Sequence, residues 1–88
     1  MKIKDGFVLR EAGGSFIIVP TGSARVDFNG MISLNGTGAF IWRTIESGSG
    51  REAIVAALAA RYEVDESKAE EDAEYFFAKL REANLVEE

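Results

Sequence analysis

The sequence predicts an α+β fold in which a three-stranded antiparallel sheet is followed by three helices. Apolar and polar residues alternate over residues 6–11, and residues 16–19 form a short apolar run; both patterns are typical of strands. Residues 31–34 have the length of a third strand. Asn35 then offers a side-chain cap for a helix, and from residue 39 onward apolar side chains recur at helical spacing.

The length of 88 residues predicts a single domain, residues 1–88. Hydrophobic residues make up 47% of the chain, which is enough for one modest core without disulfides. Three strands followed by three helices is a winged-helix-like plan with its strands moved to the front.

The first two predicted strands are separated by turn residues. The first is Gly6–Glu11, whose alternation is typical of a half-buried strand. Ala12-Gly13-Gly14 supplies the turn. The run Phe16–Val19 is apolar on both faces, which favours the middle strand of a small sheet, and Pro20 ends it.

The third strand has two possible partners. Asn29-Gly30 predicts a tight turn directly before it, because both residues tolerate positive φ. Residues 24–28 could therefore pair with residues 31–34 as a tight hairpin. Alternatively, residues 31–34 form the third strand of a meander with the two earlier strands. The local pattern allows both arrangements.

The first two helices are predicted from caps and apolar stripes. Asn35 caps the first helix, and Ser49 with Glu52 three residues later forms a capping box for the second, which runs to about residue 62. The apolar stripe of the first helix contains Ala39, Ile41, Trp42 and Ile45, and that of the second contains Ile54, Ala57, Leu58 and Tyr62.

The third helix is predicted to be the longest. Asp65 caps it, and Val64 with Ala69 is placed as a hydrophobic staple. Asn84 is a left-handed terminator, after which residues 85–86 fold back onto the core. The predicted buried face contains Ala69, Ala73, Phe76, Leu80 and Ala83. Across the whole fold, the side chains predicted to be most buried are Leu34, Trp42, Leu58, Phe76 and Leu80.

Composition excludes several classes of function. The net charge of -5 disfavours binding to nucleic acid or anionic membranes. The chain has no cysteine and no histidine, so most enzyme mechanisms lack their usual groups, and we expect no cofactor and no metal. The acidic residues at 70–74 are expected to be solvated and stabilised by the helix dipole. Without an apolar signal or membrane segment, the protein is expected to be cytoplasmic.

Five short segments along the chain carry a family resemblance: Phe28-Asn29-Gly30, Leu34-Asn35, Thr37-Gly38-Ala39, Ile41-Trp42 and Leu80-Arg81-Glu82-Ala83-Asn84-Leu85. Together they resemble the PqqD-like family, small domains that recognise leader peptides of ribosomally made, post-translationally modified peptides. The resemblance covers nearly the full chain and contains no catalytic signature. It implies the meander, with a leader peptide added as an antiparallel strand to the edge at residues 31–34.

The predicted binding site is this edge together with one flank of the third helix. The edge, formed by Met31, Ile32, Ser33 and Leu34, has no lysine, proline or charge to protect it from pairing. Apolar leader side chains would lie between this edge and the third helix. Helical periodicity leaves two flanks open: Phe77 and Arg81 on one side, or Lys68, Asp72 and Lys79 on the other. We favour Phe77 as an apolar groove residue, with Arg81 as partner of a leader carboxylate.

The leading functional hypothesis is a non-catalytic module that presents a precursor peptide to a separate modifying enzyme. The resemblance implies that this enzyme is often a radical SAM enzyme. We expect a monomer that binds neither nucleic acid nor membrane. The alternative is a winged-helix DNA-binding regulator, which the helix order suggests, although acidic residues outnumber basic ones in the third helix.

Overall fold

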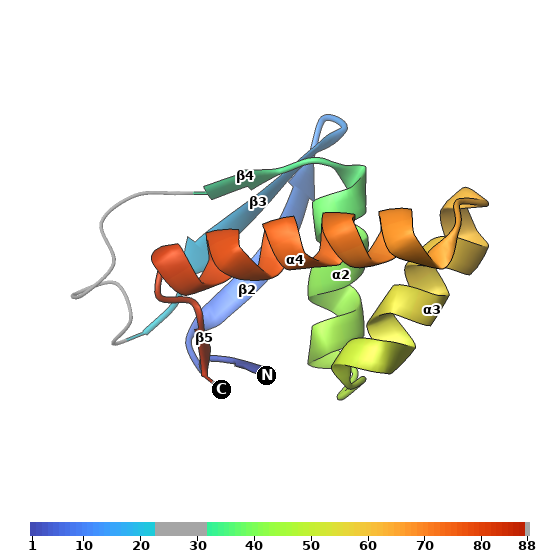
Figure 1. The fold of residues 1–88 in the computed structure, drawn as a ribbon. Coiled ribbons are helices and arrows are strands. Elements are labelled where there is room, and N and C mark those ends of the chain that lie inside the picture. Colours follow the sequence, from blue (N-terminus) through green and yellow to red (C-terminus); the bar gives the residue numbers. More distant parts are fainter. Residues whose placement is uncertain (23–31, 88) are drawn as a thin grey trace.

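The computed structural model describes residues 1–22 and 32–87. Within these ranges, three helices follow three longer strands, and two very short strands lie near the termini (Figure 1). The elements, in chain order, are β1 (Lys2–Ile3), β2 (Phe7–Ala12), β3 (Ser15–Pro20), β4 (Ile32–Leu34), α2 (Gly36–Glu46), α3 (Arg51–Tyr62), α4 (Glu66–Glu82) and β5 (Val86–Glu87).

The sheet is an antiparallel meander of order β2-β3-β4, so the predicted α+β fold is confirmed. A two-residue turn joins β2 to β3, since Ala12 pairs with Ser15 across Gly13 and Gly14. Both glycines have positive φ, at 57° and 83°, as a primed hairpin turn requires. The alternative hairpin through residues 24–28, the Asn29-Gly30 turn and Met31 lie outside the described residues.

Two of the predicted helix caps are confirmed. The Asn35 carboxamide oxygen accepts a hydrogen bond from the Gly38 N–H at 2.7 Å, and Asp65 accepts one from the Lys68 N–H at 2.8 Å. Each side chain satisfies one of the N–H groups that the first helical turn leaves without a partner. At the other end of α4, Asn84 has a φ of 61°, which confirms the left-handed terminator.

The predicted capping box at Ser49 is wrong. The residue that precedes α3 in extended conformation is Gly50, and no side chain bonds the first turn there. Ser49 lies one residue too early, and its hydroxyl instead shares a hydrogen bond with the Ser47 hydroxyl at 3.3 Å. Glu52 is consequently only two residues from the true cap, which is too close for the reciprocal bond of a capping box.

One core lies between the sheet and the helices. All five side chains predicted to be most buried are buried, and Ile18 of β3 and Leu85 join them with no exposed surface. Figure 1 shows α4 lying across the sheet and α2, with α3 at the far end. The predicted set lacked Val55 and Phe77, which are also buried.

Tyr62 was wrongly placed in the buried stripe of α3. Its side chain is 40% exposed at the last residue of the helix. The ring packs edge-on against Phe40 of α2, with the two centroids 6.2 Å apart, and the Arg61 guanidinium lies over both rings. Tyr62 therefore covers the outside of the contact between α2 and α3.

The two termini lie side by side, because β1 pairs antiparallel with β5. The Lys4 N–H donates to the Leu85 carbonyl at 2.9 Å, and the Lys4 ammonium donates to the Asn84 side chain at 2.6 Å. This pairing confirms that residues 85–86 fold back, and it places Leu85 under the C-terminal end of α4. Neither two-residue strand was predicted.

Candidate functional site

The outer edge of β4 pairs with no strand in the described parts of the chain, because β4 is the last strand of the meander. Ser33 is exposed, whereas Ile32 and Leu34 face the core side of the sheet. A free edge without lysine, proline or charge presents backbone donors and acceptors that another extended segment can pair with.

The register shows which backbone groups of the sheet point outward. In a two-residue hairpin the closing residues, here Ala12 and Ser15, form a hydrogen-bonded pair, and bonded pairs then alternate along the ladder. The Thr21 N–H donates to the Gly6 carbonyl at 2.6 Å, which agrees with this phase. The odd-numbered residues of β3 therefore direct their N–H and C=O groups toward β2, and the even-numbered ones direct theirs toward β4.

On β4 the same alternation leaves Ser33 facing outward. Phe16 and Ile18 of β3 pair with Leu34 and Ile32. Because these β3 residues point toward β4, Leu34 and Ile32 use their own backbone groups in the sheet. Ser33, opposite Ile17, is thus the residue of β4 that directs its N–H and C=O to the free edge.

Two hollows lie between β4 and α4. The first, of about 270 Å³, lies beside the start of α2, and the second, of about 320 Å³, lies toward the C-terminal end of α4. Leu34 and Lys79 border both hollows. The first is lined by Leu34, Asn35, Thr37, Gly38, Ile41, Asp72, Tyr75, Phe76 and Lys79. The second is lined by Ile32, Leu34, Lys79, Leu80, Glu82, Ala83 and Leu85. We call the two hollows together the β4–α4 groove.

Close packing of α2 against α4 shapes the first hollow. A Cβ added at Gly38 would lie 2.8 Å from the Phe76 ring and 3.4 Å from the Leu34 Cβ. Any side chain at this position would displace the Phe76 ring, so the absence of a side chain at Gly38 allows α2 and α4 to pack this closely where both residues line the hollow. The Asn35 cap holds the same turn in place from the β4 side.

The charged residues of the groove come from one flank of α4. The Lys68 ammonium donates to the Asp72 carboxylate at 2.9 Å, and this contact raises the pKa of Lys68. Lys68 therefore balances the charge of Asp72 at one end of the groove. Lys79 lies two turns further along, and Glu82 borders only the second hollow.

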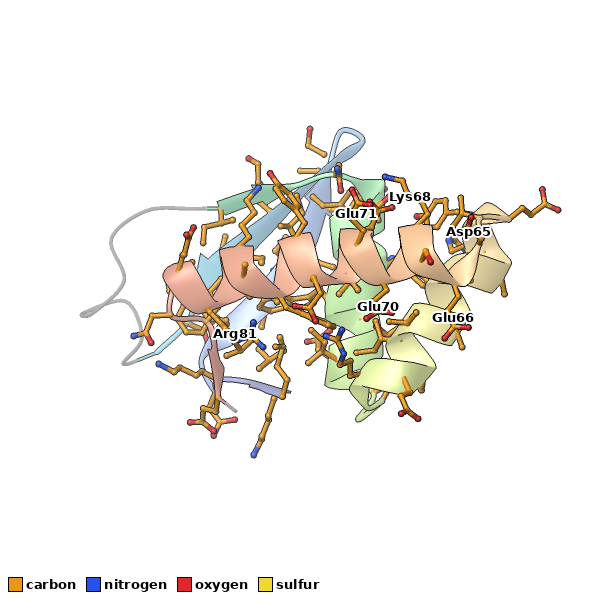
Figure 2. All side chains as sticks on the ribbon, viewed as in Figure 1. Asp65, Glu66, Lys68, Glu70, Glu71 and Arg81 are labelled. Carbon is orange, nitrogen blue, oxygen red and sulfur yellow. The ribbon has the colours of Figure 1, made fainter. Side chains whose placement is uncertain are left out.

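Phe77 and Arg81, the two favoured residues, lie on the other flank of α4 and do not line the β4–α4 groove. Phe77 is buried, and with Arg81 it borders a separate hollow of about 150 Å³ shared with Met1, Arg51 and Ile54. Figure 2 shows Lys68 on the side of α4 toward β4 and Arg81 on the opposite side. Asp72 and Lys79 thus lie with Leu34 around the first hollow, Lys79 lies with Ile32 around the second, and Lys68 contacts Asp72. Ser33 lies on the strand between Ile32 and Leu34.

Tyr75 is a groove residue that the sequence reasoning missed. Its side chain is 73% exposed and borders the first hollow. Helical spacing could have predicted this position, because Tyr75 lies three residues after Asp72 and four before Lys79 and therefore on the same flank. An aromatic ring so exposed beside a hollow is the kind of side chain that anchors interfaces.

Two acidic residues of α4 form ion pairs at the surface. The Arg51 guanidinium contacts the carboxylates of Glu70 and Glu74. In residues 1–22 and 32–87, no group of three or more metal-ligating side chains is close enough to hold an ion. No helix in these ranges is sufficiently long and apolar to cross a membrane.

Two solved structures share this fold. One is TbiB1 in complex with the TbiA(beta) leader peptide: it is 29% identical, with a TM-score of 0.80 over 99% of this chain and 95% of that one. The other is a lasso peptide synthetase B1 complexed with the leader peptide: it is 18% identical, with a TM-score of 0.79 over 99% of this chain and 96% of that one. No curated protein matches the chain.

The family comparison covers almost the whole fold. Residues 9–86 match the model of the family described as coenzyme PQQ synthesis protein D, PqqD. The match begins within β2 and ends within β5, and so includes the meander, all three helices of the described chain and the groove between β4 and α4. By this match and by its fold, the chain belongs to the PqqD family.

Proposed function

We propose that the chain binds the leader segment of a ribosomally synthesised precursor peptide and presents it to a separate modifying enzyme, without catalysing a reaction itself. The observation that carries this proposal is the outer edge of β4, which no strand of the described residues pairs with and which runs directly beside the two hollows of the β4–α4 groove. An extended peptide that pairs with this edge would place alternate side chains over the groove.

The backbone of Ser33 supplies the main-chain contacts in this proposal. Its outward N–H and C=O bond the leader, while Ile32 and Leu34 form the floor beneath the leader side chains. Asp72, Tyr75 and Lys79 form the opposite wall, with Lys68 behind Asp72.

The two similar structures support a peptide as the ligand. Both proteins, TbiB1 and the lasso peptide synthetase B1, were solved with a leader peptide bound. Since the chain has no histidine or cysteine, it lacks the commonest general base and the thiol nucleophile of enzymes, and we infer a binding module. Such a module acts by raising the concentration of the precursor near the enzyme.

The family resemblance suggests a radical SAM enzyme as the partner. The proposed mode needs only one copy of the chain, because one β4 edge and one α4 complete the groove. We place the protein in the cytoplasm, where ribosomal precursor peptides are made.

Titration calorimetry with a precursor peptide and its two halves tests the proposal. The full precursor and its isolated leader are expected to bind with dissociation constants within about threefold of each other, while the isolated core is expected to show no heat of binding. The reason is that the β4 edge recognises an extended leader and makes no contact with the modified region. Equal binding of core and leader would contradict a leader-specific site.

The DNA-binding alternative makes a different prediction. A DNA reader neutralises phosphates, so its affinity falls steeply with salt. Of the charged residues of α4 between Glu66 and Glu82, the acidic ones outnumber Lys68, Lys79 and Arg81. We therefore expect no measurable duplex binding in fluorescence anisotropy at physiological ionic strength. Tight and salt-sensitive binding to a duplex would favour the alternative.

A further inference from the structure

We propose that Lys79 selects a leader peptide that carries an Asp or Glu carboxylate on the side facing α4. This inference rests on the proposed function and names a chemical feature of its ligand. The carboxylate would lie at the boundary between the two hollows, where Lys79 and Leu34 border both.

The position of Lys79 makes its charge available along the groove. Its side chain borders the apolar surface of Leu34 and Leu80 in the second hollow and that of Phe76 in the first. A lysine can lay its methylene stem along such a surface and keep its ammonium at the rim. A strand added to β4 would pass this rim, because α4 and β4 form the two sides of the groove.

The charge of Lys79 has no partner among the described residues. Lys68 donates to Asp72, and Arg51 contacts Glu70 and Glu74, but no hydrogen bond or ion pair in the described ranges holds the Lys79 ammonium. Asp72 lies two turns away and is already balanced by Lys68. Among the residues that the structure describes, Lys79 is therefore the groove cation whose charge is not compensated.

Glu82 sets a limit on where a leader carboxylate can lie. It lies three residues after Lys79 and borders the second hollow only. A carboxylate bound deep in that hollow would meet the like charge of Glu82, whereas one at the boundary would meet Lys79 first. If Lys79 selects the carboxylate, removal of the Lys79 charge should weaken binding of an acidic peptide, and removal of the Glu82 charge should strengthen it.

This site differs from the one expected at Arg81. Arg81 lies on the far flank of α4, beside Phe77 and Met1, and no peptide paired with β4 passes it. Within the groove, Lys79 is therefore the residue that would bind the leader carboxylate.

Selection of peptides from a random display library tests the inference without assuming any leader sequence. A library of 12-residue peptides is selected on the parent protein and on Lys79→Met, and binders are retained only if Ser33→Pro abolishes their binding. We expect Asp and Glu to be enriched in the pool from the parent, and expect that enrichment to disappear in the pool from Lys79→Met. Lys2→Met, which removes a lysine outside the groove, should leave the enrichment unchanged.

One selected acidic peptide and its Glu→Gln or Asp→Asn variant then complete a double-mutant cycle in calorimetry. Lys79→Met is expected to weaken the acidic peptide about threefold to fivefold at low ionic strength, and to leave the amidated peptide nearly unaffected. Lys79→Arg should retain most of the affinity, and Glu82→Gln should strengthen the acidic peptide. High salt should abolish the differences.

The outcomes separate this inference from the proposed function. If no selected peptide depends on the β4 edge, the proposed function itself is contradicted. If edge-dependent peptides are found but show no acidic enrichment, or show the same enrichment on Lys79→Met, strand addition stands and the role of Lys79 is overturned.

Discussion

Replacement of Ser33 by proline is expected to abolish leader binding while the protein stays folded. Ser33 is the residue of β4 whose N–H points to the free edge, so proline removes the donor that the leader would pair with. The proline ring also occupies the space that the incoming strand needs. Since the lost N–H makes no bond within the sheet, an edge position accepts proline with limited damage to the fold.

The matched control is Ile32→Pro, one residue earlier on the same strand. The Ile32 N–H points inward, so its removal leaves the Ile18 carbonyl without a donor at a site that is fully buried. An unsatisfied buried acceptor costs about 1 to 3 kcal/mol. Ile32→Pro should therefore lower the free energy of unfolding, an effect that Ser33→Pro should largely lack.

Calorimetry with the leader peptide and circular dichroism of each variant distinguish the two effects. A folded Ser33→Pro that binds at least ten times more weakly than the parent is the expected result. If Ser33→Pro stays folded and binds the leader like the parent, strand addition at β4 is not the mechanism. If instead the stability loss falls on Ser33→Pro, the derived hydrogen-bond phase is wrong.

Local signals predicted most of the fold. Asn35 and Asp65 each cap a helix because a short side-chain oxygen at that position bonds the first-turn N–H groups, whatever the rest of the chain does. The run in β3 is apolar on both faces of the strand, and this pattern predicted its position between two other strands. Such features depend on neighbours in sequence, so the sequence alone predicts them.

The side of α4 that faces the groove depends on tertiary packing. Periodicity predicts a buried stripe but treats its two flanks alike. Phe77 is the flank residue that α3 covers, as its shared hollow with Ile54 shows, and this leaves the Asp72, Tyr75 and Lys79 flank for β4. The sequence of α4 alone does not show which side α3 occupies, so periodicity could not predict which flank faces β4.

The terminal strands were missed for a different reason. β1 and β5 have two residues each, too few to show an alternating pattern. Their pairing follows from the return of the chain at Asn84, which brings Leu85 beneath α4 and Val86 beside Ile3. Short pairings of this kind become visible only when the distant segments are placed together.

Truncation of Trp42 to alanine is expected to have the largest effect on stability. Trp42 has no exposed surface and lies in the same core as Ile18, Leu58 and Leu80. Loss of such a side chain costs about 3 to 5 kcal/mol, from lost burial and the cavity left behind. For a domain of this size the total stability is on the order of 4 to 13 kcal/mol, so a large part of the fold's stability would be lost.

Trp42→Phe separates the contribution of bulk from that of the indole nitrogen. In the described structure the Trp42 Nε1 is buried and no hydrogen bond partner lies within reach, so the tryptophan carries the cost of an unsatisfied donor. Phenylalanine removes that donor and keeps one aromatic ring. We therefore expect Trp42→Phe to cost less than half as much as Trp42→Ala in denaturant unfolding. A loss below about 1 kcal/mol for Trp42→Ala would show that this side chain does not hold the helices to the sheet.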